Sequence, residues 1–178
     1  MYVASILQEN KRVIHMFDIV LSIVSAVCTL VSVIGAYKSI KYYKKSKQLT
    51  VYANTNVSLV EIQKIISTFT EILKLANTAR PQRGINLPKQ LAVYGENIRD
   101  SINVLRDKLS VEDYELIKGQ LSSKELRVDM YIDSFISGTI LNDGKLELDD
   151  RFNRCQQKFY DIQQILKKRL EEVEEKLT

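Results

Sequence analysis

The sequence predicts an all-α protein, in which an N-terminal transmembrane helix is followed by a cytoplasmic helical bundle of four to five helices. One long apolar run, Phe17 to Tyr37, contains a single charged residue, Asp18, near its start. After this run, apolar residues recur at helical spacing through the rest of the chain. Val51-Tyr52 is the only β-like stretch, and it is too short to predict a strand. We therefore expect two parts, residues 1–45 and residues 46–178.

The apolar run has the length of a membrane span. Its 21 residues form a helix of ~31 Å at ~1.5 Å per residue, which matches a hydrocarbon core of ~30 Å. A cleaved signal peptide has a shorter apolar core of roughly 7–15 residues, and a basic cluster follows this run instead of a cleavage site. The run therefore predicts a retained transmembrane helix.

The distribution of basic residues predicts the orientation of this helix. Only Lys11 and Arg12 precede the run, whereas five lysines follow it: Lys38, Lys41, Lys44, Lys45 and Lys47. The imbalance favours a single pass through the inner (cell) membrane, with the N-terminus outside and the C-terminal domain in the cytoplasm. The first 47 residues carry seven basic and two acidic residues, and this charge of +5 predicts that the five lysines contact membrane lipid.

The polar and small residues of the run fall on one face of the helix. They alternate in steps of four and three residues, and we call them the polar seam: Asp18, Ser22, Ser25, Thr29, Ser32, Ala36 and Ser39. A 3.5-residue repeat keeps one face turned toward a common axis in a left-handed supercoil. The polar seam therefore predicts a homo-oligomer, a tetramer or larger. In it, the seam is either the interface between helices or the lining of a water-filled pore.

The remaining chain is expected to form amphipathic helices. The first carries Val57, Val60, Ile62, Ile65, Ile66, Phe69, Ile72 and Leu73 on its apolar face and ends near Ala79. The second carries Leu91, Tyr94, Ile98, Ile102, Leu105 and Leu109. The last, from near Asp149, carries Phe152, Cys155, Phe159, Ile162, Leu166, Leu170, Val173 and Leu177. Between them, capping boxes at Ser110 with Asp113 and at Ser122 with Glu125 predict two shorter helices, and Asn142-Asp143-Gly144 predicts a turn.

Charge in the cytoplasmic part is arranged in blocks. Residues 74–108 carry seven basic and three acidic residues, residues 109–150 carry four and ten, and residues 151–169 carry six and one. Such blocks either attract neighbouring helices and subunits, or bind the phosphates of a nucleotide or short single-stranded nucleic acid. In the second interpretation, Arg80, Arg83, Arg151, Arg154 and Lys158 bind phosphate, and Tyr94, Phe152 and Tyr160 stack on bases.

The residue types argue against several classes of site. The only histidine, His15, lies at the outer membrane boundary, so no hydrolase triad and no enzyme activity are expected. Cys28 lies in the apolar run and Cys155 in the cytoplasmic part, so they are not expected to pair or to form a zinc site. The Asn142-Asp143-Gly144 turn lacks the oxygen ligands of a calcium loop. No metal and no cofactor are predicted.

This layout of one N-terminal span followed by a compact cytoplasmic domain resembles that of small single-span bacterial phage-defence membrane effectors of the Hailong type. The resemblance covers the organisation of the chain, and it implies a channel held by short single-stranded DNA. Two hypotheses follow. The first is an oligomeric effector whose cytoplasmic domain gates a pore or ion channel, in phage defence by membrane disruption. The second is a membrane-anchored helical adaptor or immunity-type protein that binds another protein and forms no pore.

Overall fold

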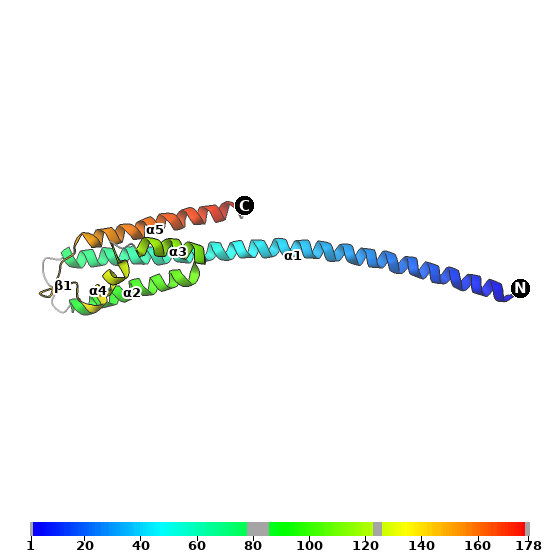
Figure 1. The fold of residues 1–178 in the computed structure, drawn as a ribbon, viewed down its shortest axis with the longest axis horizontal. Helices are drawn as coiled ribbons and strands as arrows, with labels where there is room; N and C mark the ends of the chain where they lie inside the picture. The colour runs from blue at the N-terminus through cyan, green and yellow to red at the C-terminus, as the bar shows by residue number, and fades with distance from the viewer. Residues whose placement is uncertain (1, 78–85, 123–125, 177–178) are drawn as a thin grey trace. The chain divides into compact units, whose positions relative to one another are not determined.

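The structure, a computed structural model, describes residues 2–77, 86–122 and 126–176, with side chains described from His15 onward. In these ranges it contains five helices and one short hairpin (Figure 1). The helices are α1 (Tyr2–Asn77), α2 (Leu87–Lys108), α3 (Val111–Leu121), α4 (Val128–Ser137) and α5 (Asp150–Glu175). The hairpin consists of β1 (Leu141–Asn142) and β2 (Lys145–Leu146). The all-α fold class predicted from the sequence is confirmed.

The chain divides into two compact units, Met1–Lys47 and Gln48–Thr178. The boundary expected from the sequence, between residues 45 and 46, lies two residues before this division. In the first unit, every described side chain is exposed to solvent. The second unit contains the rest of α1 together with all the other elements. We describe the two units separately.

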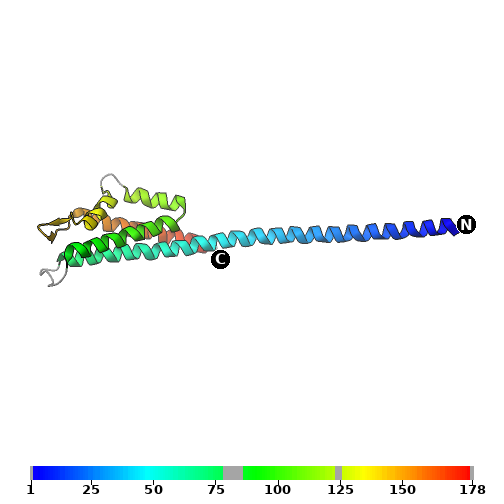
Figure 2. The same ribbon diagram turned by 90° about the horizontal axis from the view of Figure 1, so that it is seen from below.

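In the second unit, α2 and α5 both run antiparallel to the C-terminal part of α1 (Figure 1 and Figure 2). The shorter helices complete the bundle, because α4 packs against α2 and α3 packs against α5. Helices in such an arrangement bury one apolar stripe each and leave the opposite face to water. The seams predicted for α2 and α5 follow this rule, since Leu91, Ile98 and Leu105, and Phe152, Phe159 and Ile162, are all fully or almost fully buried.

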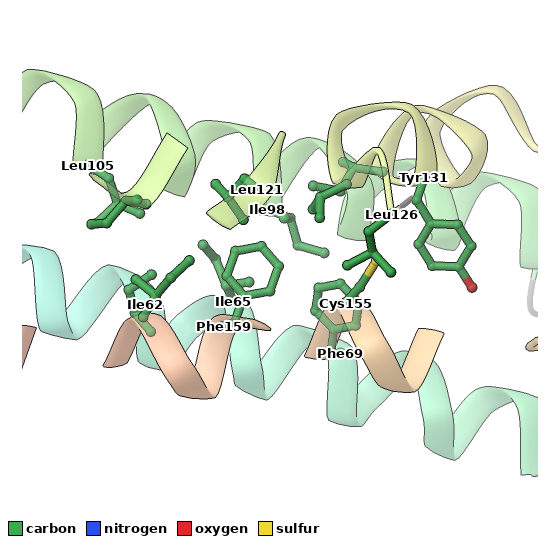
Figure 3. Close-up of a cluster of buried hydrophobic side chains, with 14 of the residues drawn as sticks. Ile62, Ile65, Phe69, Ile98, Leu105, Leu121, Leu126, Tyr131, Cys155 and Phe159 are labelled. Carbon is green, nitrogen blue, oxygen red and sulfur yellow. The ribbon is translucent and has the colours of Figure 1, made fainter. Parts of the chain in front are cut away.

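The centre of this bundle is an aromatic cluster around Phe69. Its ring centroid lies 5.2 Å from that of Phe152, 5.5 Å from that of Phe159 and 6.5 Å from that of Phe135. These rings come from α1, α4 and α5 and therefore fix three helices against one another. Figure 3 shows the aliphatic side chains that surround them, among them Ile62, Ile65, Ile98, Leu105 and Leu121.

Gly95 allows α2 and α4 to approach closely. A Cβ atom at this position would lie 2.6 Å from Cγ1 of Ile136 and 3.3 Å from the carbonyl oxygen of Ile132. The second contact is with the backbone of α4, which cannot move away as the end of a flexible side chain can. Gly95 is therefore required by packing, although glycine in a helix interior costs about 1 kcal/mol relative to alanine.

One predicted helix start is confirmed and one is wrong. The hydroxyl of Ser110 accepts a hydrogen bond from the amide of Asp113 at 3.1 Å and begins α3 as expected. Ser122, in contrast, is the C-terminal cap of α3, and α4 begins only at Val128 after Arg127. The predicted partner of Ser122, Glu125, lies outside the described residues.

The turn at Asn142-Asp143-Gly144 is present, and it closes a hairpin that the sequence did not predict. Asn142 pairs with Lys145 and Leu141 with Leu146 in an antiparallel register. Asp143 and Gly144 both have positive φ, 48° and 74°, as a two-residue loop of the I′ type requires. Two-residue strands lack the length for a period-two pattern, so the sequence carried no strand signal here.

The predicted core face of α1 is wrong at its beginning. Val57 and Val60 are 40% and 50% exposed, whereas Thr55 and Ser58 are buried. The hydroxyls of Thr55 and Ser58 donate to the carbonyl oxygens of Val51 and Asn54, four residues earlier, at 2.9 Å each. Because these donors are satisfied within the helix, both side chains can be buried at low cost.

Candidate functional site

One helix among the described residues, α1 from His15 onward, is apolar and long enough to cross a membrane. None of its most apolar stretch is buried inside the structure. Exposed aliphatic side chains such as Leu21, Val24 and Val31 need an apolar environment, because a contiguous apolar surface of this size is unfavourable in water. The N-terminal part of α1 is therefore a candidate single-pass membrane anchor.

Along this helix, all seven residues of the polar seam are exposed. Two of its hydroxyls are bonded to the helix itself. Thr29 donates to the carbonyl oxygen of Ser25 and Ser32 donates to that of Cys28, at 2.8 Å each. A hydroxyl has a single donor hydrogen, so at these two positions the donor is used and the oxygen is presented outward as an acceptor.

This arrangement restricts what can bind the seam. Two identical helices meeting at Thr29 or Ser32 would bring acceptor against acceptor, and no hydrogen bond forms between them without a rotation of the side chain. Water can donate hydrogen bonds to these acceptors, and cations are attracted to their oxygen lone pairs. The carboxylate of Asp18 adds a negative charge at the beginning of the same face. The polar seam is thus better suited to water and cations than to direct hydroxyl–hydroxyl bonding.

The five lysines predicted to contact lipid lie on the same helix, and all are exposed: Lys38, Lys41, Lys44, Lys45 and Lys47. At ~3.6 residues per turn they span about half of the helix circumference. A one-sided basic stripe would suit a single acidic partner. An arc over half of the circumference is wider than such a stripe and suits a layer of anionic headgroups.

The predicted phosphate-binding residues of α5 share one face, and two of them, Arg151 and Lys158, already contact other side chains of the protein. Nε of Arg151 lies 2.7 Å from the Asp149 carboxylate, and its guanidinium lies 5.4 Å from the ring centroid of Tyr131. Nζ of Lys158 donates to the side chain of Gln120 at 3.1 Å. Arg154 is exposed on the face between them. Arg80 and Arg83 lie outside the described residues.

Asp149 connects this face to the bundle. Burial alone raises the pKa of Asp149, but the hydrogen bonds and charge of Arg151, with a hydrogen bond from the Tyr131 hydroxyl, lower the pKa below its ordinary value. Asp149 also caps α5 by accepting from the amide of Arg151. Binding a phosphate with Arg151 would therefore break the ion pair between its guanidinium and Asp149, whereas the cap made by the Arg151 amide would remain.

The structure corrects one of the three base-stacking residues. Phe152 is 1% exposed and packs against Phe69, so the prediction that its ring stacks on a base is wrong. Tyr94 is half-buried and its hydroxyl accepts a hydrogen bond from Gln90 at 3.1 Å. Tyr160 remains available, with 39% of its surface exposed.

A groove that the sequence did not predict lies between α1 and α2. It has a volume of about 470 Å³ and is lined mainly by polar side chains, among them Glu61, Lys64, Asp100 and Ser101. Burial alone raises the pKa of Glu61, but hydrogen bonds from Lys64 (2.6 Å) and Ser101 (2.8 Å) and the Lys64 charge lower it below the ordinary value. Glu61 is therefore ionised. With two carboxylates and one ammonium, the groove does not suit a phosphate.

Comparisons of this chain with protein-family models, with curated proteins and with solved structures give no match.

Proposed function

We propose that the protein is an oligomeric membrane effector, in which the N-terminal parts of α1 from several copies enclose a pore. The polar seam lines this pore, and the second unit is a cytoplasmic domain that gates it. The protein crosses the inner membrane once, with its N-terminus outside. The resemblance in layout to Hailong-type effectors adds phage defence by membrane disruption to the proposal.

The observation that carries the proposal is the spacing of the polar seam, which keeps polar and small residues on one exposed face and includes Thr29 and Ser32. Because their hydroxyls donate to their own helix, the seam presents oxygen acceptors at these positions. The same bond to the carbonyl four residues earlier lets Thr55 and Ser58 be buried in the bundle, so this bond alone permits an interface as well as a lumen. A ring of acceptors with Asp18 at one end provides polar contacts for water and cations along the span.

Gating requires a ligand that binds the open and closed states with different affinity. We propose a nucleotide or short single-stranded nucleic acid, bound at the basic face of α5. Arg154, which is exposed, and Lys158, which is half-buried and bonded to Gln120, lie one turn apart on this face. Tyr160 is also exposed, but it follows Lys158 by two residues, about 200° around the helix, and therefore lies off this face. Binding there would alter the packing of α5 in the second unit. The C-terminal part of α1 belongs to the same unit, so a change in its packing can act on the helix that forms the pore.

Asp18→Asn is expected to lower the preference of the pore for cations several-fold, because it removes one negative charge per subunit from one mouth. The measurement is the reversal potential in a planar bilayer under a potassium chloride gradient. It should move toward zero in the variant, while the single-channel current persists. Val20→Ala, on the aliphatic face of the same helix, serves as the control and should leave the reversal potential unchanged. An unchanged reversal potential in Asp18→Asn contradicts a position for Asp18 at the pore mouth.

Arg154→Glu is expected to weaken retention of a fluorescent single-stranded oligonucleotide, because a phosphate contact becomes a repulsion. Loss of one contact lowers the slope of log affinity against log salt by about 0.7. The measurement is fluorescence anisotropy with full-length protein in nanodiscs of neutral lipid, at several salt concentrations. Arg106→Glu, an equal charge change at an exposed position of α2, is the control. Equal binding by wild type and Arg154→Glu excludes the α5 face as the site.

A further inference from the structure

The second unit exposes an apolar face on α1 that its own bundle does not cover. Ala53, Val57 and Val60 lie on this face, which we call the Val57 face, and all three are exposed. The opposite side of the same turns packs into the bundle through Leu59 and Ile62. An exposed valine pair one turn apart on a helix gains free energy when it is covered, at about 25 cal/mol per Å² of apolar surface removed from water.

The Val57 face continues the spacing of the polar seam. After Ser39, the alternation of four and three residues runs through Tyr43, Ser46, Thr50, Ala53, Val57 and Val60. Counted along the sequence, Asp18 and Val60 are six heptads apart, and no charged residue stands at a seam position between them. A straight helix drifts by about 20° per heptad from a 3.5-residue repeat, so only a supercoiled assembly keeps these positions on one seam. The absence of charge at these positions is what an association of identical helices requires, because like charges would repel there.

Charge is absent from this stretch of the sequence. No lysine, arginine, aspartate or glutamate occurs from Gln48 to Val60, although the chain as a whole is 27% charged. Depletion of charged residues marks the core of protein interfaces. In a parallel assembly of identical helices each residue meets its own counterpart, so a charged seam would repel itself. An uncharged face fits a second copy of this chain better than it fits a charged partner.

We propose that the Val57 face packs against the same face of other copies of this chain, and that it forms the contact between subunits in the second unit. The proposal deepens the assembly proposed above, and it does not require that the assembly conduct ions. Lys64, four residues after Val60, is the first charged residue at a seam position after Asp18, and its ammonium is paired with Glu61, so we place the end of the contact before it. β-branched residues at successive seam positions favour three or more helices over two. This preference agrees with the tetramer or larger assembly predicted from the polar seam.

Cysteine cross-linking in the full-length protein in lipid vesicles tests this interface. Cys28→Ala removes the cysteine of the first unit. Cys155 can be kept, since burial raises the pKa of its thiol to about 12 and leaves it unreactive. In this background Val57→Cys and Val60→Cys are treated with a short bismaleimide. The matched control is Val93→Cys, because Val93 is a valine of similar exposure, 46%, on α2.

We expect covalent dimers and higher species for both seam variants and monomer for Val93→Cys. Monomer at both seam positions, or equal cross-linking at Val93, overturns the proposal. If either variant fails to fold, Ala53→Cys tests the preceding seam position. Conductance of the same vesicles separates this inference from the proposed function. Cross-links without conductance leave the interface standing without a pore, and conductance without cross-links leaves a pore whose subunits meet elsewhere.

Discussion

Phe69→Ala is expected to destabilise the second unit by about 3–5 kcal/mol, the usual cost of removing a fully buried phenylalanine. Phe69 is fully buried and lies within 6.5 Å, between ring centroids, of three other phenylalanines. Its loss leaves a cavity bordered by α1, α4 and α5, and rigid aromatic neighbours do not collapse readily into such a space. Because small domains are stable by only about 5–15 kcal/mol, this change removes a large part of the total.

Urea unfolding of the full-length protein in detergent, followed by circular dichroism, measures this effect as a shift of the transition midpoint. Leu116→Ala is the matched control, because Leu116 is about half exposed on α3 and its truncation should change stability by less than about 0.5 kcal/mol. A loss below about 1 kcal/mol for Phe69→Ala would contradict its central place in the core. The slope of the transition should stay the same, since the surface exposed on unfolding hardly changes.

The sequence predicted the helices because their apolar residues recur with a helical period, and the buried Leu91, Ile98, Phe159 and Ile162 follow directly from it. The sequence-based prediction of the core is wrong where an apolar residue is exposed or a polar residue is buried. The apolar pattern predicts Val57 as core and leaves Ser58 out, because a pattern cannot show that the Ser58 hydroxyl bonds to the carbonyl oxygen of Asn54. Which side of α1 faces the bundle is decided by partners that are distant in the sequence.

The candidate site was predictable to a similar extent. The polar seam follows from the spacing of its residues, and α1 is helical over all of them. The direction of its hydrogen bonds could not be predicted, because a threonine can donate backward to its own helix or forward to a neighbour. Phe152 was assigned both to the α5 seam and to base stacking, and only packing against Phe69 decides between these roles.

Thr29→Leu is expected to abolish ion conduction while the protein still assembles. Thr29 lies near the middle of the apolar run, and a leucine there replaces a ring of oxygen acceptors by a ring of apolar groups. Hydrophobic constrictions of this kind close pores by excluding water. The measurement is single-channel recording in a planar bilayer, with cross-linking at Val57→Cys in the same background to report assembly. Thr29→Ser keeps the hydroxyl and should still conduct, and Val31→Leu places the same side chain on the aliphatic face.

The pair Thr29→Leu and Thr29→Ser separates the two roles of the seam better than any assembly assay. If the seam only joins helices, leucine should preserve or strengthen association and no current should depend on it. The hydroxyl of Thr29 already donates to Ser25, so its removal costs an interface little, whereas it costs a water-filled lumen one acceptor per subunit. Loss of current with leucine and retention with serine would therefore identify a lumen. Vesicles that stay silent with wild-type protein, even after nuclease treatment and high-salt washing to strip a bound ligand, would instead favour a membrane-anchored adaptor.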